Sequence, residues 1–287
     1  MPCPAVDQWP VPSFVENAAF LRFLPGSVTI GASMLLDSSQ FMIGLASALL
    51  IGLSKGGLGG GLGVLVVPVM SLTMDPRVAA ALTLPILIIA DFFAIYAWRG
   101  QHHSGHFRVL LVGAVIGIGF GALTFHLVSE PMMRLMMGLM ALAYVGSRWL
   151  GIGKPATTPQ PPQPVAGTVL GALSGFTSFT AHAGGPPVQI YLLPKGLDKA
   201  SYQATHVVLF TLINLIKVPP YMALGQFTGP VLLTALALIP AAALGVLIGY
   251  RLQHRLPEKW FFRIAIILLA LTGLKLTFDG GAALLGP

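Results

Sequence analysis

Six ionisable residues stand out among those inside the long apolar stretches of this sequence. They are Lys55, Asp91, His126, His182, His206 and Lys217. Ionisable side chains in such surroundings are costly, and they are retained where they bind an ion, carry a proton or pair with another charge. Both lysines of this set are cationic, and its three histidines become so on protonation. The chemistry that these residue types favour is the binding of an anion.

Two glycine-rich breaks hold two of these cations. Lys55 lies in SKGGLGGG (54–61), and His182 begins HAGGPP (182–187). Backbone that leaves helical geometry at membrane depth must be buried in protein or line a wet cavity. Glycines leave their N–H groups unhindered, and the N-terminus of a half-helix carries a partial positive charge. The two breaks together predict one central anion site, although close helix packing explains any single glycine equally well.

The predicted substrate-binding residues combine the glycine N–H groups, nearby hydroxyls and the cations. They are Ser54, Lys55, Gly57, Gly59, Gly60, Gly61, Thr83, Thr180, His182, Gly184, Gly185, Thr205 and His206.

Three of the six ionisable residues, His206 among them, also have structural explanations. A lone buried histidine such as His206 is expected to be neutral and bonded to a backbone carbonyl. Lys217 precedes Pro219-Pro220 near the end of its apolar stretch, so we expect it to extend to the membrane surface. His126 has a similar position near the end of a helix.

Asp91 is the single acid within a predicted span, and it matches Asn214 in the second half at an offset of 123. Either it neutralises Lys55, or it carries a coupling proton or sodium ion. Both interpretations remain open, and Asp91 and Asn214 are the predicted coupling positions.

Composition identifies the solvent around these residues as lipid. The chain has 287 residues, of which 55% are hydrophobic and 9% charged, and its mean hydropathy is +0.82. So few charges cannot cover a soluble globule of this size. The net charge of +7 is spread singly between apolar runs, which excludes a nucleic-acid surface and predicts topology signals instead. We therefore expect an all-α integral membrane protein.

Metal, cofactor and catalytic motifs are absent from the sequence. Cys3 is the only cysteine, and the loop histidines His102, His103 and His106 have no neighbouring carboxylate, so we expect a solvated loop there. SKGG does not complete a P-loop, and neither G-x-S-x-G nor HExxH occurs. The sequence predicts no cofactor, no metal and no enzyme.

Six apolar stretches are expected to cross the membrane, each needing about 20 residues. They are 78–98, 109–128, the shorter 132–147, 204–224, 228–250 and 260–278. A pair of shorter runs precedes each group of three, namely 41–53 with 62–74 and 165–181 with 188–194.

The resulting organisation has five segments. These are an N-terminal segment (1–40), a first transmembrane repeat (41–154), a Pro-rich linker (155–164), a second repeat (165–278) and a tail (279–287). Residues 1–27 lack the pattern of a signal peptide, and 10–24 are a candidate interfacial helix.

The two halves align with each other. Gly60-Gly61 precedes Gly184-Gly185 by 124 positions, and other landmarks repeat at offsets between 122 and 126. If each broken pair enters and leaves on one face, the repeats are inverted and the basic residues divide ten to four between the faces. Parallel repeats give eight to four, so we favour inverted repeats with both termini outside the cytoplasm.

The sequence resembles the sulfite exporter TauE/SafE family of permeases, also called the TSUP family. The resemblance rests on GLSKGGLGGGLGVLVVP (52–68) with AAALTLP (79–85), and on GFTSFTAHAGGPPVQIYLLP (175–194) with YQATHVVLF (202–210). It implies a permease for sulfite, organosulfonates and related sulfur-containing anions. His182 departs from the small residue expected beside the second glycine run, so it is a candidate for substrate selectivity.

The sequence therefore predicts a multi-pass transporter of the inner (cytoplasmic) membrane. Its partners are a small sulfur anion such as sulfite or sulfoacetate, the lipid bilayer, and a proton or sodium ion that drives transport. An anion channel, or a transporter of another small carboxylate or oxyanion, remains the alternative.

Overall fold

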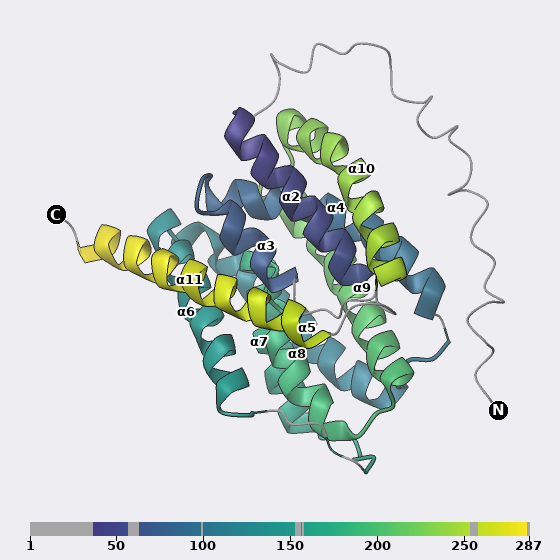
Figure 1. Ribbon diagram of the computed structural model, residues 1–287. Coiled ribbons are helices and arrows are strands. Elements are labelled where there is room, and N and C mark those ends of the chain that lie inside the picture. The colour runs from purple at the N-terminus through teal and green to yellow at the C-terminus, as the bar shows by residue number, and fades with distance from the viewer. Residues whose placement is uncertain are drawn as a thin grey trace. The chain divides into compact units, whose positions relative to one another are not determined.

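The computed structural model describes residues 37–56, 63–98, 100–152, 156, 158–252 and 258–285 (Figure 1). Within these residues it has ten α-helices, two short 3-10 helices and no strand. The all-α prediction is confirmed. The candidate interfacial helix at 10–24 lies outside the described residues.

The helices fall into two groups of five along the chain. The first group is α2 (Ser38–Lys55), α3 (Gly63–Met70), α4 (Pro76–Trp98), α5 (Ser104–Thr124) and α6 (Glu130–Trp149), with a 3-10 turn at Phe125–Leu127. The second is α7 (Pro164–Ala181), α8 (Gly185–Leu192), α9 (Lys199–Ala223), α10 (Gly229–Leu252) and α11 (Glu258–Leu285), with a 3-10 turn at Leu193–Lys195.

Five described helices are long and apolar enough to cross a membrane. These spans are Pro76–Ile95, Ser104–Leu127, Ala200–Ala223, Gly229–Gly249 and Ile266–Leu285. They coincide with the five long stretches predicted from the sequence. The shorter sixth stretch forms α6, which does not meet the same criterion among the described residues.

Each half of the chain opens with a broken helix pair. α2 ends at Lys55 and α3 begins at Gly63, and α7 ends at Ala181 before α8 begins at Gly185. Helices α3 and α8 have 8 residues each, which corresponds to about 12 Å. Because the hydrocarbon core is about 30 Å thick, neither short helix crosses it alone.

Side-chain caps fix where several helices begin. Asp37 accepts from the N–H of Gln40 at the start of α2, and Ser129 accepts from Met132 N–H at the start of α6. Asp198 accepts from two N–H groups in the first turn of α9. Such caps satisfy N–H groups that have no partner inside the helix. The cap at Asp198 thus fixes the start of α9.

Glycines allow α5 and α7 to pack backbone against backbone. A Cβ added at Gly113 would lie 2.1 Å from Thr168 O, and one added at Gly117 would lie 1.9 Å from Ala172 O. The contacts advance together along both helices, so α5 and α7 run parallel. Small residues are what permits such close approach in lipid.

The pair α2 and α10 repeats this arrangement (Figure 1). Gly245 lies against Leu49, and Gly249 lies against Leu53, so these helices are parallel too. By contrast, α6 and α11 are antiparallel, because Gly138 lies against Gly273 and Thr277 whereas Gly280 lies against Leu135.

The predicted linker is bound to the second half of the chain. Gln160 N–H donates to Lys195 O at 3.0 Å, and Gln163 N–H donates to the Tyr191 hydroxyl at 3.1 Å. Helix α7 begins at Pro164, the last residue of that predicted segment. The described part of the linker is therefore packed along the end of α8.

Candidate functional site

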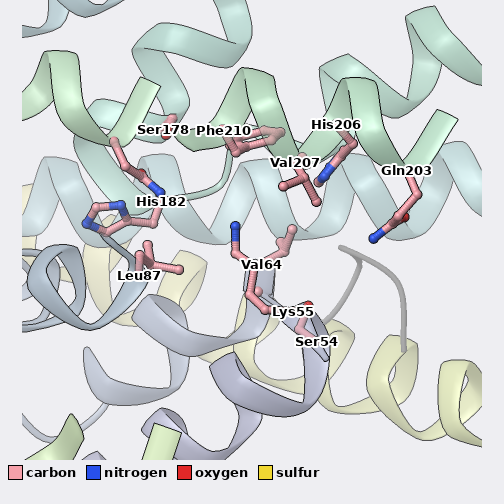
Figure 2. Close-up of a pocket in the computed structure, with 13 residues that line it drawn as sticks. Ser54, Lys55, Val64, Leu87, Ser178, His182, Gln203, His206, Val207 and Phe210 are labelled. Carbon is pink, nitrogen blue, oxygen red and sulfur yellow. The ribbon is translucent and has the colours of Figure 1, made fainter. Parts of the chain in front are cut away.

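A cavity of about 50 Å³ lies where both broken helix pairs meet α4 and α9 (Figure 2). Its lining comprises Ser54, Lys55, Gly63, Val64, Leu87, Ser178, His182, Gly185, Gln203, His206, Val207, Phe210 and Asn214. Since about 10–15 Å³ of such space holds one water, this partly open cavity suits a small ligand.

Five of the predicted substrate-binding residues are brought together in this lining, and the predicted coupling residue Asn214 joins them. The five are Ser54, Lys55, His182, Gly185 and His206. They come from the end of α2, the α7–α8 break and the middle of α9. The convergence of distant segments at one cavity is what the sequence pattern predicted.

Lys55 points into the cavity while holding an ion pair at its edge. Its Nζ donates to Asp91 Oδ1, and Asn214 Nδ2 donates to Asp91 Oδ2 at 2.6 Å. The Asp91 side chain is fully buried, whereas that of Lys55 is 15% exposed. Both carboxylate oxygens are thus occupied, and the ion pair that was one of the two interpretations of Asp91 is present.

His206 differs from the expectation of a histidine bonded to a carbonyl. It is 7% exposed, yet its Nε2 has no hydrogen-bond partner among the described residues. The ring packs against Phe210, with centroids 4.6 Å apart. In Figure 2, His206 and Gln203 on α9 extend toward the space that Lys55 enters from α2. A buried ring nitrogen without a partner, beside a cavity, is suited to bind a ligand.

Gln203 and Ser178 were missed by the sequence interpretation. Gln203 lies three residues before His206 on α9, so the two share a helix face. The signal was present in YQATHVVLF, where one turn of helix carries two polar groups before the apolar run. Ser178 similarly lies four residues before His182, at the end of α7.

His182 ends α7 in a left-handed backbone conformation, with φ of 50°. It is the one described non-glycine residue with positive φ, a conformation that glycine usually provides at this position. Its Nε2 is 2.9 Å from the carbonyl oxygen of Ala80 on α4. The departure from a small residue noted in the sequence therefore cross-links the second break to α4.

Lys217 does not extend to the membrane surface, and that prediction is wrong. Helix α9 continues through Pro219 and Pro220 to Ala223, so Lys217 lies inside the helix rather than at its end. The side chain is fully buried. Its Nζ is 2.7 Å from His182 Nδ1 and 3.1 Å from both Ser178 O and Ser178 Oγ.

Other predicted residues do not line the cavity. Thr83 and Thr205 donate to the carbonyls of Ala79 and Ser201 within their own helices, and Thr205 also accepts from a loop N–H at 2.9 Å. Thr180 donates to Phe176 O at 3.1 Å. These hydroxyls serve local structure.

The predicted glycines of the two breaks also differ in role: Gly185 lines the cavity, whereas Gly184 has a structural contact. Gly184 O accepts from Ser174 Oγ at 2.8 Å, which satisfies a carbonyl in the second break. Gly57, Gly59, Gly60 and Gly61 lie outside the described residues. At the start of α8, Gly185 is followed by Pro186 and Pro187, which have no N–H group. Helix α8 therefore presents fewer donors to an anion than its position suggests.

The histidines at the start of α5 are partly buried and do not form a solvated loop. His106 is fully buried, with its Nδ1 3.2 Å from the Tyr191 hydroxyl. His126 is exposed, as expected near a helix end. Among the described residues, no group of three or more His, Cys, Asp or Glu side chains is arranged to hold a metal ion.

These features define a multi-pass α-helical membrane protein whose broken helices enclose a small, cation-lined cavity. The arrangement is typical of secondary transporters. The sequence model of the family described as sulfite exporter TauE/SafE matches residues 44–276. No curated protein and no solved structure matches the chain.

The chain belongs to the sulfite exporter TauE/SafE family. It is therefore a membrane transporter for sulfite or related sulfur-containing anions rather than an enzyme.

Proposed function

We propose that this protein is an ion-coupled secondary transporter that moves sulfite or a short organosulfonate such as sulfoacetate across the cytoplasmic membrane. The observation that carries the proposal is the convergence of Lys55, His206 and Gln203 on one cavity beside both helix breaks. Together they offer a fixed cation and N–H donors at the place where an anion loses its water.

The lining of the cavity favours a compact substrate. Polar groups converge from α2, α7 and α9, whereas Val64, Leu87, Val207 and Phe210 supply apolar walls. A sulfonate or sulfite group would take the polar side, and a chain of one or two carbons would contact the apolar side. The small volume of about 50 Å³ disfavours a bulky organic group.

Inverted repeats are the architecture that we propose for the two halves, with residues 41–154 and 165–278 as the repeating units. The packing of α2 with α10 and of α5 with α7 supports this, since exchanging the halves converts one pair into the other. The equivalent helices α6 and α11 pack antiparallel, as an inversion requires. Parallel repeats would make these two helices parallel.

Coupling would act through Asp91. Lys55 contacts Asp91 in the cavity without substrate, and an anion bound beside Lys55 would compete for the same ammonium group. A carboxylate released from Lys55 would then attract a proton or sodium ion. Anion and coupling ion would thereby favour each other's binding, which is reciprocal by thermodynamic linkage.

Transport into proteoliposomes tests this function. Labelled sulfite, sulfoacetate and sulfate are supplied in turn, under an imposed proton gradient, a sodium gradient or neither. We expect sulfite or sulfoacetate to accumulate and one gradient to increase the accumulation. Absence of transport of all three anions would refute the proposal. Voltage-step currents far above carrier rates would instead identify an anion channel.

A further inference from the structure

Lys217 is a buried lysine whose contacts all come from the end of α7 that borders the cavity. Its Nζ lies 3.1 Å from Ser178 O, 3.1 Å from Ser178 Oγ and 2.7 Å from His182 Nδ1. It stands within the span Ala200–Ala223, and its side chain is fully buried. Ser178 and His182 themselves line the cavity, so one layer of side chains separates Lys217 from a bound ligand.

The contacts of His182 indicate the form of its ring. Nε2 is 2.9 Å from Ala80 O, and because a carbonyl oxygen only accepts, Nε2 carries the hydrogen. The other nitrogen, Nδ1, then has a lone pair that accepts from Lys217. Three acceptors thus surround Nζ, which matches the three N–H groups of a charged ammonium.

No carboxylate described by the structure pairs directly with Lys217, whose contacts are Ser178 and His182. Asp91 pairs with Lys55, and the other carboxylates whose side chains the structure describes lie at helix starts or on the surface with their own partners. Those are Asp37, Asp75, Glu130, Asp198 and Asp279. Lys55, Lys217 and Asp91 together form what we call the buried centre. Its two lysines and one aspartate leave one net positive charge. An unbalanced charge away from water is costly until a counter-ion arrives.

We propose that Lys217 is the second fixed cation of the substrate site and that the site binds one net negative charge. This rests on the proposed function, and it defines the substrate class more closely: a monoanion, such as a sulfonate without a second charged group or hydrogen sulfite, in preference to a dianion such as sulfoacetate. Ser178 and His182 hold Lys217 behind the cavity and separate it from direct contact with the ligand.

The charge balance has a consequence for dianions. A bound monoanion brings the centre to zero net charge, whereas a dianion leaves one uncompensated negative charge. Binding of a dianion therefore requires one more proton or other cation to enter than binding of a monoanion does. Asp91, once its contact with Lys55 is broken, is the group that takes up this cation.

Binding of two probe anions to purified full-length protein tests the inference. Methanesulfonate carries one negative charge throughout the assay range and sulfate carries two. We expect the wild type to bind methanesulfonate at least about tenfold more tightly than sulfate. Lys217→Met should weaken methanesulfonate binding by at least about tenfold, in line with the cost of removing one partner of a buried charge pair.

Lys275→Met is the matched control. It makes the same chemical change in a side chain that is 59% exposed and pairs with Asp279 on the surface of α11. It should leave the affinities for both anions unchanged.

Two further variants vary the net charge of the centre. Asp91→Asn raises it to two positive charges, and should shift the affinity ratio toward sulfate by at least about tenfold. Lys217→Met with Asp91→Asn returns it to one positive charge, now on Lys55, and should restore methanesulfonate binding toward the wild-type value. This double variant provides the test even if Lys217→Met alone fails to fold, as judged by thermal unfolding.

The outcomes separate the two proposals. If the wild type binds neither anion, the proposed function fails. If the wild type binds methanesulfonate and Lys217→Met binds it equally well, the role of Lys217 is refuted while the proposed function stands. An affinity ratio that is the same in all four proteins would likewise refute the charge-balance inference.

Discussion

Asn214 donates a hydrogen bond of 2.6 Å to Asp91, a residue 123 positions earlier in the chain. This separation falls within the offsets of 122 to 126 at which the two halves of the sequence align. Residues at equivalent positions of two repeats contact each other only close to the axis that relates the repeats. The pair therefore supports a two-fold relation between the halves, with the Lys55–Asp91 ion pair beside its axis.

Inverted repeats predict the side of the membrane on which each loop lies. Single cysteines at Gln101, Gln160 and Ser129, each exposed, are introduced after Cys3→Ser removes the native thiol. In intact cells, an impermeant thiol reagent should label position 129 and leave positions 101 and 160 unlabelled until the membrane is permeabilised. Labelling of 101 and 160 from outside would contradict the proposed topology.

Glycine packing predicts a difference between two positions on α5. A Cβ added at Gly117 would lie 1.9 Å from Ala172 O, whereas one at Gly119 meets nothing within 4 Å. Gly117→Ala should destabilise the protein by about 1–3 kcal/mol, because the backbone of α7 must move. Gly119→Ala should be neutral or stabilising by up to about 1 kcal/mol, since alanine favours helix. Thermal unfolding in detergent measures both, and equal effects would contradict the packing.

The spans and breaks were predictable from the sequence because lipid requires long apolar helices and glycine runs interrupt them visibly. The orientation of individual side chains could not be predicted from the sequence. Lys217 was placed at the surface because Pro219 and Pro220 indicated a helix end, yet α9 continues past both. Gln203 was overlooked because a polar residue near the start of a transmembrane helix gives the same sequence pattern whether it lines a cavity or lies at the membrane surface.

The threonines show a second limit of sequence interpretation. Thr83 and Thr205 stand at matching repeat positions and were predicted to bind substrate, but their hydroxyls bond to their own helices. A hydroxyl in an apolar helix needs an acceptor, and the nearest one is the preceding turn. Repetition of a polar residue therefore does not by itself distinguish a local bond from a ligand contact.

The Lys55–Asp91 ion pair predicts a rescue. Lys55→Met leaves a fully buried Asp91 without its cation, and should cost about 3–5 kcal/mol of stability. Asp91→Asn should cost less, because Lys55 is 15% exposed and can turn into the cavity. Combining both changes should recover most of the stability lost in Lys55→Met. Thermal unfolding of the four proteins gives the interaction energy, and simple additivity would show that the pair contributes nothing.

Transport separates the two roles of that ion pair. If Asp91 carries the coupling ion, Asp91→Asn should reduce the dependence of uptake on the ion gradient while the affinity for the anion remains measurable. If the pair is structural, the double variant should regain gradient-driven transport along with stability. Uptake with and without the gradient distinguishes these results.

His206 predicts opposite changes in stability and activity. Its Nε2 is buried without a partner among the described residues, and such a group costs about 1–3 kcal/mol. His206→Phe fills similar space without a polar atom, so the protein should be as stable as the wild type or more so. Substrate affinity should fall by about tenfold to a hundredfold, because a hydrogen bond to an ionised ligand contributes about 1.5–3 kcal/mol. His126→Phe, at an exposed position in the 3-10 turn that follows α5, controls for the substitution itself and should leave substrate affinity unchanged.

Thermal unfolding and a substrate titration of both variants provide the measurement. A His206→Phe protein that loses stability but binds substrate normally would show that His206 supports the fold and does not contact the anion.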